Sequence, residues 1–201
     1  MQHFNGSKQY WEDRYQNKGT SGAGSYGRLA EFKAEVINNF VIANNIKSVI
    51  EFGCGDGNQL SLANYKNYLG VDVSEQAVKL CKQKFKDDTT KQFVHSSEYH
   101  EQTAELALSL DVIYHLIEQD IYENYLRVLF RSAEKFVIIY SSNFFANKSS
   151  KAVHVKHRKF TDDIGGNWEI IDRLKNKFPY QYENRNDTSF CDFYIFKRKE
   201  K

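Results

Sequence analysis

The chain contains five short runs rich in apolar residues, each followed by a polar turn or by a stretch with helical spacing. Short continuous runs of this kind are typical of strands buried on both faces of a sheet, because neither face then needs polar side chains. We expect these strands over residues 48–52, 68–73, 92–95, 104–110 and 135–141.

Apolar residues at helical spacing fill much of the sequence between these runs. One face of a helix over 29–45 would carry Leu29, Phe32, Val36, Ile37, Phe40 and Val41. Further helices are expected to begin near Asn58, to span 75–85 behind an N-cap at Ser74, and to span 120–133. This alternation of strands and helices predicts an α/β fold with a doubly wound, mostly parallel sheet.

The C-terminal third of the chain departs from this alternation. Two apolar segments, 168–178 and 189–197, predict a closing antiparallel strand pair. Residues 142–166 are weakly patterned, and a loop of that length in a compact domain is usually functional or disordered. We therefore expect an N-terminal arm and lid helix over 1–44, followed by one domain over 45–201 in which residues from about 142 to 166 cover a substrate.

A glycine loop follows the first predicted strand and is the most informative stretch of the sequence. It reads Glu51-Phe-Gly53-Cys-Gly55-Asp-Gly57-Asn58. A strand, a glycine loop and a helix N-terminus together form a pocket at the carboxyl edge of a parallel sheet. No Lys-Ser or Lys-Thr follows, which excludes a phosphate-binding P-loop, and Asn58 stands where a dinucleotide GxGxxG motif needs its third glycine. Asp72 ends the next strand, where a carboxylate accepts the ribose hydroxyls of an adenosine.

Composition narrows the class of protein further. The 28 Lys and Arg residues nearly balance the 26 Asp and Glu residues in a chain of 201 residues, so the whole molecule lacks the charge excess of a nucleic-acid or membrane binder. Cys54, Cys81 and Cys191 have no zinc-type spacing and read as reduced thiols, and we expect no metal site and a cytoplasmic protein. No stretch has the length and apolarity of a signal peptide or a membrane span.

Three segments in register give the chain a family resemblance. They are the glycine loop at 51–57, the segment Gly70-Val-Asp72-Val-Ser74, and the segment Leu108-Ser-Leu-Asp111-Val-Ile-Tyr-His115-Leu116. Over about 45–200 the sequence resembles the class I S-adenosylmethionine-dependent methyltransferases. The resemblance implies the Rossmann-like methyltransferase fold, S-adenosyl-L-methionine as the cofactor and S-adenosyl-L-homocysteine as the product.

The resemblance also implies which residues bind the cofactor. Gly53 and Gly55 would pack against its methionine part, Asp72 would hold the ribose, and Ser97 stands in a segment that would lie beside the adenine, where the family's usual Asp is missing. Arg14 would pair with the methionine carboxylate, unless the arm simply packs on the sheet as a helix. The full expected cofactor set is Arg14, Glu51, Gly53, Cys54, Gly55, Asp72, Val73, Ser97 and Leu110.

Methyl transfer to a weakly acidic hydroxyl needs a base as well as close approach of the two reactants. Asp111, Tyr114 and His115 follow the fourth predicted strand at the mouth of the site and are the expected catalytic residues. His115 has the ordinary pKa that suits a base near neutrality. Alternatively, Asp111 caps a turn while Tyr114 and His115 only pack.

The segment from Lys148 to Lys159 carries five Lys or Arg residues and two histidines without an acidic residue. We expect His154, His157 and Arg158, together with Tyr26 in the arm, to bind an anionic substrate, although a solvated charged loop is the usual reading of such a run. The chain also looks like bacterial enzymes of surface-polysaccharide biosynthesis. The expected reaction is therefore O-methylation of a small phosphate-, phosphoramidate- or uronate-bearing sugar or glycan precursor.

Other functions remain open at this point. The main alternatives are an RNA or protein methyltransferase and a catalytically inactive module that binds S-adenosylmethionine. A nucleic-acid partner is disfavoured because the basic run contains no interleaved stacking aromatics. Cytosine-carbon methyltransferases use a Pro-Cys nucleophile, and the single proline of this chain, Pro179, precedes a Tyr. Amino-group methyltransferases carry an Asn-Pro-Pro-Tyr type motif after the fourth strand, which this chain lacks. The lack of resemblance to both families disfavours methylation of nucleobases. The sequence leaves the oligomeric state open.

Overall fold

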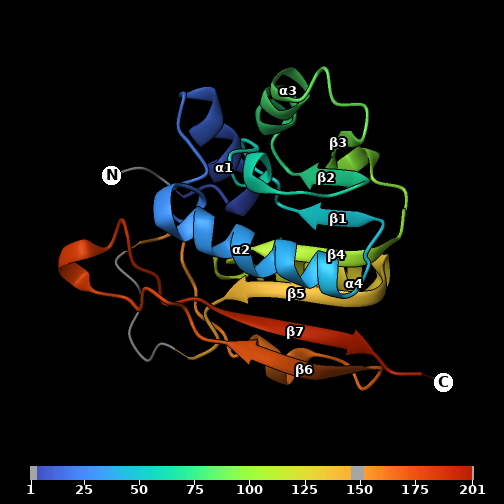
Figure 1. Ribbon diagram of the computed structural model, residues 1–201. Coiled ribbons are helices and arrows are strands. Elements are labelled where there is room, and N and C mark those ends of the chain that lie inside the picture. The colour runs from blue at the N-terminus through green and yellow to red at the C-terminus, as the bar shows by residue number, and fades with distance from the viewer. Residues whose placement is uncertain (1–3, 146–151, 201) are drawn as a thin grey trace.

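A seven-stranded sheet forms the centre of the molecule (Figure 1). The computed structural model describes residues 4–145 and 152–200, so Lys148 and Lys151 of the predicted basic run lie outside the described residues. The strands are arranged in the order β3-β2-β1-β4-β5-β7-β6. They are β1 Val49–Phe52, β2 Tyr68–Asp72, β3 Lys91–His95, β4 Ala104–Leu110, β5 Ala133–Ser141, β6 Trp168–Leu174 and β7 Asp192–Arg198.

The first five strands are parallel, and β7 pairs antiparallel with both β5 and β6. This arrangement confirms the predicted α/β fold with its closing antiparallel pair. All four residues of β1 are buried, because helices cover both faces of the sheet.

Four α-helices surround the sheet: α1 Ser7–Gln16, α2 Gly27–Ala43, α3 Glu75–Lys84 and α4 Gln119–Ser132. Core residues of α2 and α3 pack together on one face, and those of α4 pack on the other, as Figure 1 shows for α2 and α4. The predicted N-cap of α3 is confirmed, since the Ala77 amide donates to Ser74 Oγ at 3.1 Å.

The helix expected near Asn58 does not form. The chain makes only a short 3₁₀ turn there, Gln59–Leu62, and then passes into β2 through residues without regular structure. Similar turns occur at Ala23–Ser25, Ser96–Glu98, Ile113–His115, Phe160–Asp163 and Tyr182–Asn184. The wall of the site after β1 is therefore a loop, and α1 and α2 of the N-terminal arm take part in closing it.

No described helix is long and apolar enough to cross a membrane. The three cysteines, all described, are buried free thiols. Among the described residues, no group of three or more His, Cys, Asp or Glu side chains is arranged to hold a metal ion.

Candidate active site

The carboxyl ends of β1, β2 and β4 meet at one edge of the sheet, toward which their arrows point in Figure 1 and where α1 lies. The glycine loop begins there. Gly53 and Gly55 have φ values of +86° and +59°, which disfavour residues with a side chain. A Cβ atom on Gly55 would lie 2.3 Å from Ser21 Oγ and 2.9 Å from Tyr15 Oη, so only glycine lets the arm approach the loop this closely.

Asp72 at the end of β2 is tied to this loop. Its Oδ2 accepts the Gly55 amide at 2.9 Å and its Oδ1 accepts the Ser74 amide at 2.9 Å. Burial raises the pKa of the Asp72 carboxyl, an effect that the two amides oppose. Each oxygen keeps a lone pair for a further donor, such as a hydroxyl group.

A cavity of about 380 Å³ opens between this sheet edge and the N-terminal arm. Such a volume falls in the range of pockets for small molecules and cofactors. Nine of the predicted site residues line it: Glu51, Gly53, Cys54, Gly55, Asp72, Val73, Leu110, Asp111 and His115. Seven others do not: Arg14, Tyr26, Ser97, Tyr114, His154, His157 and Arg158.

Helix α1 covers the mouth of the cavity, where Ser7, Lys8, Trp11 and Tyr15 line the wall. The first turn of the helix is attached to the loop after β4. Ser7 donates from its amide to Glu118 Oε1 at 2.8 Å, and its Oγ lies 2.8 Å from the His115 carbonyl oxygen. At the other end, Tyr15 Oη lies 2.9 Å from Ser21 Oγ, and the Ser21 amide donates to Asp56 Oδ2 in the glycine loop at 2.9 Å. The arm is thus attached on both sides of the opening.

Two arm residues lie elsewhere than expected. Tyr26, predicted to bind substrate, donates from Oη to Asp56 Oδ2 in the glycine loop at 2.7 Å. Arg14, predicted at the methionine carboxylate, donates from Nε to the Thr20 carbonyl at 2.6 Å. Both side chains therefore hold the arm in place, because their polar groups are directed at protein partners outside the cavity.

His115 has the environment of a neutral base. One of its ring nitrogens, Nδ1, lies 2.9 Å from the His154 carbonyl oxygen, which only accepts, so the proton sits on Nδ1 and Nε2 keeps its lone pair. Burial lowers the pKa of His115 to about 4, so the ring is uncharged at neutral pH but is a weaker base than the ordinary pKa expected from the sequence would give. Trp11 meets the ring edge to face at 5.0 Å between centroids.

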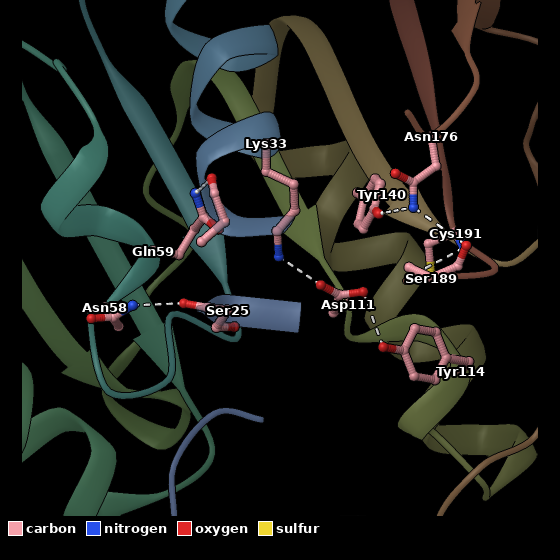
Figure 2. Close-up of polar contacts among 11 residues, drawn as sticks. Ser25, Lys33, Asn58, Gln59, Asp111, Tyr114, Tyr140, Asn176, Ser189 and Cys191 are labelled. Carbon is pink, nitrogen blue, oxygen red and sulfur yellow. Dashed lines mark hydrogen bonds and ion pairs between the residues drawn. The ribbon is translucent and has the colours of Figure 1, made fainter. Parts of the chain in front are cut away.

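Tyr114 does not reach the cavity. Its Oη donates to Asp111 Oδ1 at 3.0 Å, and burial, reinforced by the Asp111 carboxylate, raises its pKa well above the ordinary value. A phenol that stays protonated is a donor and not a base. Asp111 Oδ2 accepts Lys33 Nζ at 2.6 Å, so this carboxylate is held from two sides (Figure 2).

The predicted anion-binding residues are engaged with the protein. Arg158 is 6% exposed and donates to the carbonyls of Leu116 at 2.6 Å and Ile117 at 3.0 Å, which leaves its guanidinium facing backbone. His154 stacks on Tyr10 at 4.4 Å, and His157 bonds Ser142 Oγ at 2.8 Å. Burial lowers the pKa of both histidines below 6.5, so they are mostly neutral at pH 7 and supply no lasting positive charge.

On the adenine side, Ser96 lines the cavity in place of Ser97, because Ser97 Oγ turns to His95 Nδ1 at 2.6 Å. Sequence reasoning also missed Gln59 and Lys33, which both line the cavity. Gln59 Oε1 is buried without a described hydrogen-bond partner, and nothing in the sequence marks it. Lys33 did carry a signal, since it stands four residues from Leu29 and from Ile37, in the middle of the apolar face of α2.

Comparison with known proteins supports the resemblance to methyltransferases that the sequence indicates. Residues 50–137, somewhat less than half of the chain, match the family model described as the methyltransferase domain. This segment contains the glycine loop, Asp72, Asp111 and His115. No curated protein sequence gives a match to the chain.

Solved structures with the same fold cover nearly the whole chain. The N-methyltransferase NodS from Bradyrhizobium japonicum WM9, in complex with S-adenosyl-L-homocysteine, has a TM-score of 0.76 at 13% identity, over 98% of this chain and 100% of that one. The magnesium protoporphyrin IX methyltransferase ChlM from Synechocystis PCC 6803 has a TM-score of 0.66 at 15% identity, over 96% and 98%. A Clostridium acetobutylicum S-adenosylmethionine-dependent methyltransferase has a TM-score of 0.60 at 14% identity, over 83% and 91%.

These findings define the class of fold: the chain has the Rossmann-like fold of class I methyltransferases, and residues 50–137 match the family model of the methyltransferase domain.

Proposed function

We propose that this protein transfers a methyl group from S-adenosylmethionine to an oxygen of a small, anionic acceptor. The acceptor class is a phosphate-, phosphoramidate- or uronate-bearing sugar, or a surface-polysaccharide precursor built from one. One observation carries the proposal: a neutral histidine, His115, with an unprotonated Nε2, lines the cavity of about 380 Å³ beside the glycine loop.

The cofactor is S-adenosylmethionine, which when bound supplies a methyl group already activated on a sulfonium. The residues present fit it. Asp72 has lone pairs for the ribose hydroxyls, and the glycine loop lets a ligand approach its backbone closely. Gln59 Oε1, buried without a described partner on the cavity wall, is an acceptor for the amino group of the methionine part.

His115 is assigned as the base. A hydroxyl group attacks as a nucleophile only as its proton leaves, and Nε2 is the ring nitrogen able to receive that proton. The hydrogen bond from Nδ1 to the His154 carbonyl keeps the ring in this tautomer and orientation. Tyr114 is not assigned a catalytic part, because its hydroxyl is pinned to Asp111.

The size and charge of the acceptor follow from the arm. Helix α1 closes the mouth through Ser7 and Tyr15, which leaves room for a small molecule rather than a polymer. Since His154, His157 and Arg158 face the protein, the cation proposed for an anionic acceptor is Lys8, which lines the cavity. The free thiols suit a reducing compartment, and we assign the protein to the cytoplasm.

A two-stage experiment tests the proposal. Thermal unfolding with S-adenosylhomocysteine at one hundred times its Kd should gain about 2.7 kcal/mol of stability. Release of S-adenosylhomocysteine from S-adenosylmethionine is then measured with glucuronate, galacturonate, glucose 1-phosphate and, as a neutral control, glucose. We expect turnover with an anionic sugar and its loss in His115→Gln.

Three outcomes would contradict this assignment. Cofactor binding without turnover on any acceptor would indicate an inactive module. Turnover on RNA that weakens steeply with salt would indicate a nucleic-acid methyltransferase. Equal turnover on glucose and glucuronate would remove the anionic class while leaving the methyltransferase in place.

A further inference from the structure

A buried ion pair forms part of the cavity wall. Lys33 reaches down from α2, is 0% exposed, and places Nζ 2.6 Å from Asp111 Oδ2 (Figure 2). Both side chains line the cavity. The rest of the buried face of α2 is apolar, with Leu29, Phe32 and Ile37 as neighbours along the helix, so this charge stands alone on its face.

Asp111 is held in a strained conformation. It has φ +60°, in the left-handed region that residues with a side chain adopt only uncommonly. Its amide donates to the Tyr140 carbonyl at 2.9 Å, which carries the backbone past the end of β4. Tyr114 Oη donates to Oδ1 from the side opposite Lys33, as Figure 2 shows. The surroundings therefore determine the position of this carboxylate.

Stability alone does not explain this arrangement. A buried ion pair loses about as much in desolvation as it gains in attraction, and well-packed apolar residues often replace one without loss. Backbone strain at Asp111 adds to the cost. Strain and buried charge together are typical of functional sites, where a group must be held in one place.

We infer that Lys33 is a positioning residue for methyl transfer: it fixes the Asp111 carboxylate at the cavity wall, where that carboxylate receives a hydrogen bond from a second hydroxyl of the acceptor. The inference rests on the proposed function, in which the reacting hydroxyl gives its proton to His115. The Asp111 carboxylate has about four acceptor sites, of which Lys33, Tyr114 and Cys191 occupy three, so one is left for the acceptor. The site would accordingly prefer acceptors with at least two hydroxyl groups.

Several polar groups surround Asp111. Lys33 comes from α2, Tyr114 and His115 from the turn after β4, Tyr140 from β5, and Cys191 from the residue before β7. Lys33 is the cation among them that contacts the carboxylate. Its removal leaves the Asp111 carboxylate without a charged partner to hold it.

The decisive variant is Lys33→Gln, which removes the charge and keeps an amide able to donate. The matched control is Lys177→Gln, which breaks the Lys177–Glu35 pair, 54% and 55% exposed, on the outside of the same helix. The Kd of S-adenosylhomocysteine is measured by calorimetry in both proteins. In both, kcat/KM is measured with the best acceptor of the panel above and with an analogue of it that keeps a single hydroxyl group.

In Lys33→Gln we expect kcat/KM for the best acceptor to fall at least tenfold and its advantage over the single-hydroxyl analogue to be lost, while the Kd of S-adenosylhomocysteine changes less than threefold. A merely structural lysine would lower the melting temperature without changing the preference between the two acceptors. Lys177→Gln should match the wild type in all three measurements.

Two results would overturn the inference: an unchanged preference for the acceptor with several hydroxyl groups, or a loss of S-adenosylhomocysteine affinity that accounts for the whole loss of kcat/KM. The second result would make Lys33 a cofactor ligand. If Lys33→Gln does not fold, Asp111→Asn replaces it, with the same expected loss of turnover at intact affinity, and wild-type kcat/KM would overturn the inference. Absence of turnover in the wild type, with S-adenosylhomocysteine still bound, would refute the proposed function separately.

Discussion

The substitution Arg158→Ala distinguishes a structural role of Arg158 from a substrate-binding role. Its guanidinium donates to the carbonyl oxygens of Leu116 and Ile117 and lies 4.2 Å from the centroid of the Tyr122 ring. Arg158 lies in the 142–166 segment. Through these bonds it holds the residues that directly follow the turn carrying His115. Replacement by Ala removes the donor from two carbonyls and leaves a void beside the ring.

The size of the effect follows from these contacts. Each carbonyl that loses its donor costs about 1–3 kcal/mol where water does not replace it. The cation–π contact adds about 0.5–2 kcal/mol. Because such terms are not additive, we expect Arg158→Ala to lose about 3 kcal/mol of unfolding free energy. For a chain of this size that loss lowers the melting temperature by about 6–12 °C.

The assay is thermal unfolding followed by circular dichroism, with kinetics on the same samples at a temperature where all variants are folded. The control is Lys159→Ala, which removes a neighbouring, half-exposed cation that pairs only with Asp162 three residues on. Lys159→Ala should leave the melting temperature within about 2 °C, as for most surface substitutions. Arg158→Lys keeps the charge but loses the paired donors, so it should be nearly as unstable as Arg158→Ala.

A different pattern would refute this reasoning. If Arg158→Ala melted with the wild type, raised the KM of an anionic acceptor, and were rescued by Arg158→Lys, then Arg158 would serve the acceptor through its charge. The carbonyl contacts would in that case be dispensable.

Two further predictions follow from the cavity wall. His115→Gln should lower kcat at least about 100-fold, as loss of a general base does. Because the folded pKa of His115, about 4, lies below its ordinary 6.5, the unfolded chain binds the extra proton first. Wild-type stability relative to His115→Gln should therefore fall as the pH drops from about 6.5 to about 4, and a flat difference in melting temperature across this window would contradict the assigned environment. Gly55→Ala would place a Cβ 2.3 Å from Ser21 Oγ at a φ of +59° and should weaken S-adenosylhomocysteine binding at least about tenfold by calorimetry. Its control is Gly165→Ala, where a Cβ would meet nothing within 4 Å; equal affinity in the two variants would show that the arm does not need this close approach.

Local pattern was sufficient for the sheet. Strands buried on both faces are mostly apolar, so the apolar runs in β1 and in the buried part of β5 predicted these strands. Gly53, Gly55 and Asp72 stand at or just after the ends of two strands, a position that can be recognised in the sequence. In the structure all three line the cavity. The helix expected near Asn58 does not form, because the chain makes only the turn Gln59–Leu62 before it enters β2. Helix propensity does not record how soon the next strand begins.

The sequence by itself determined the order of the elements and the glycine loop, because these depend on residues close together along the chain, while His115 as the base stays a prediction. Tertiary structure decided how the remaining side chains are used. Arg158 and Tyr26 were predicted from their position to bind a substrate. In the folded chain Arg158 donates to a backbone carbonyl and Tyr26 donates to the Asp56 carboxylate. Lys33 and Asp111 lie 78 residues apart in the chain and meet only when α2 packs on the sheet. A buried charge requires a partner from wherever the fold supplies one, and that partner is invisible to any local pattern.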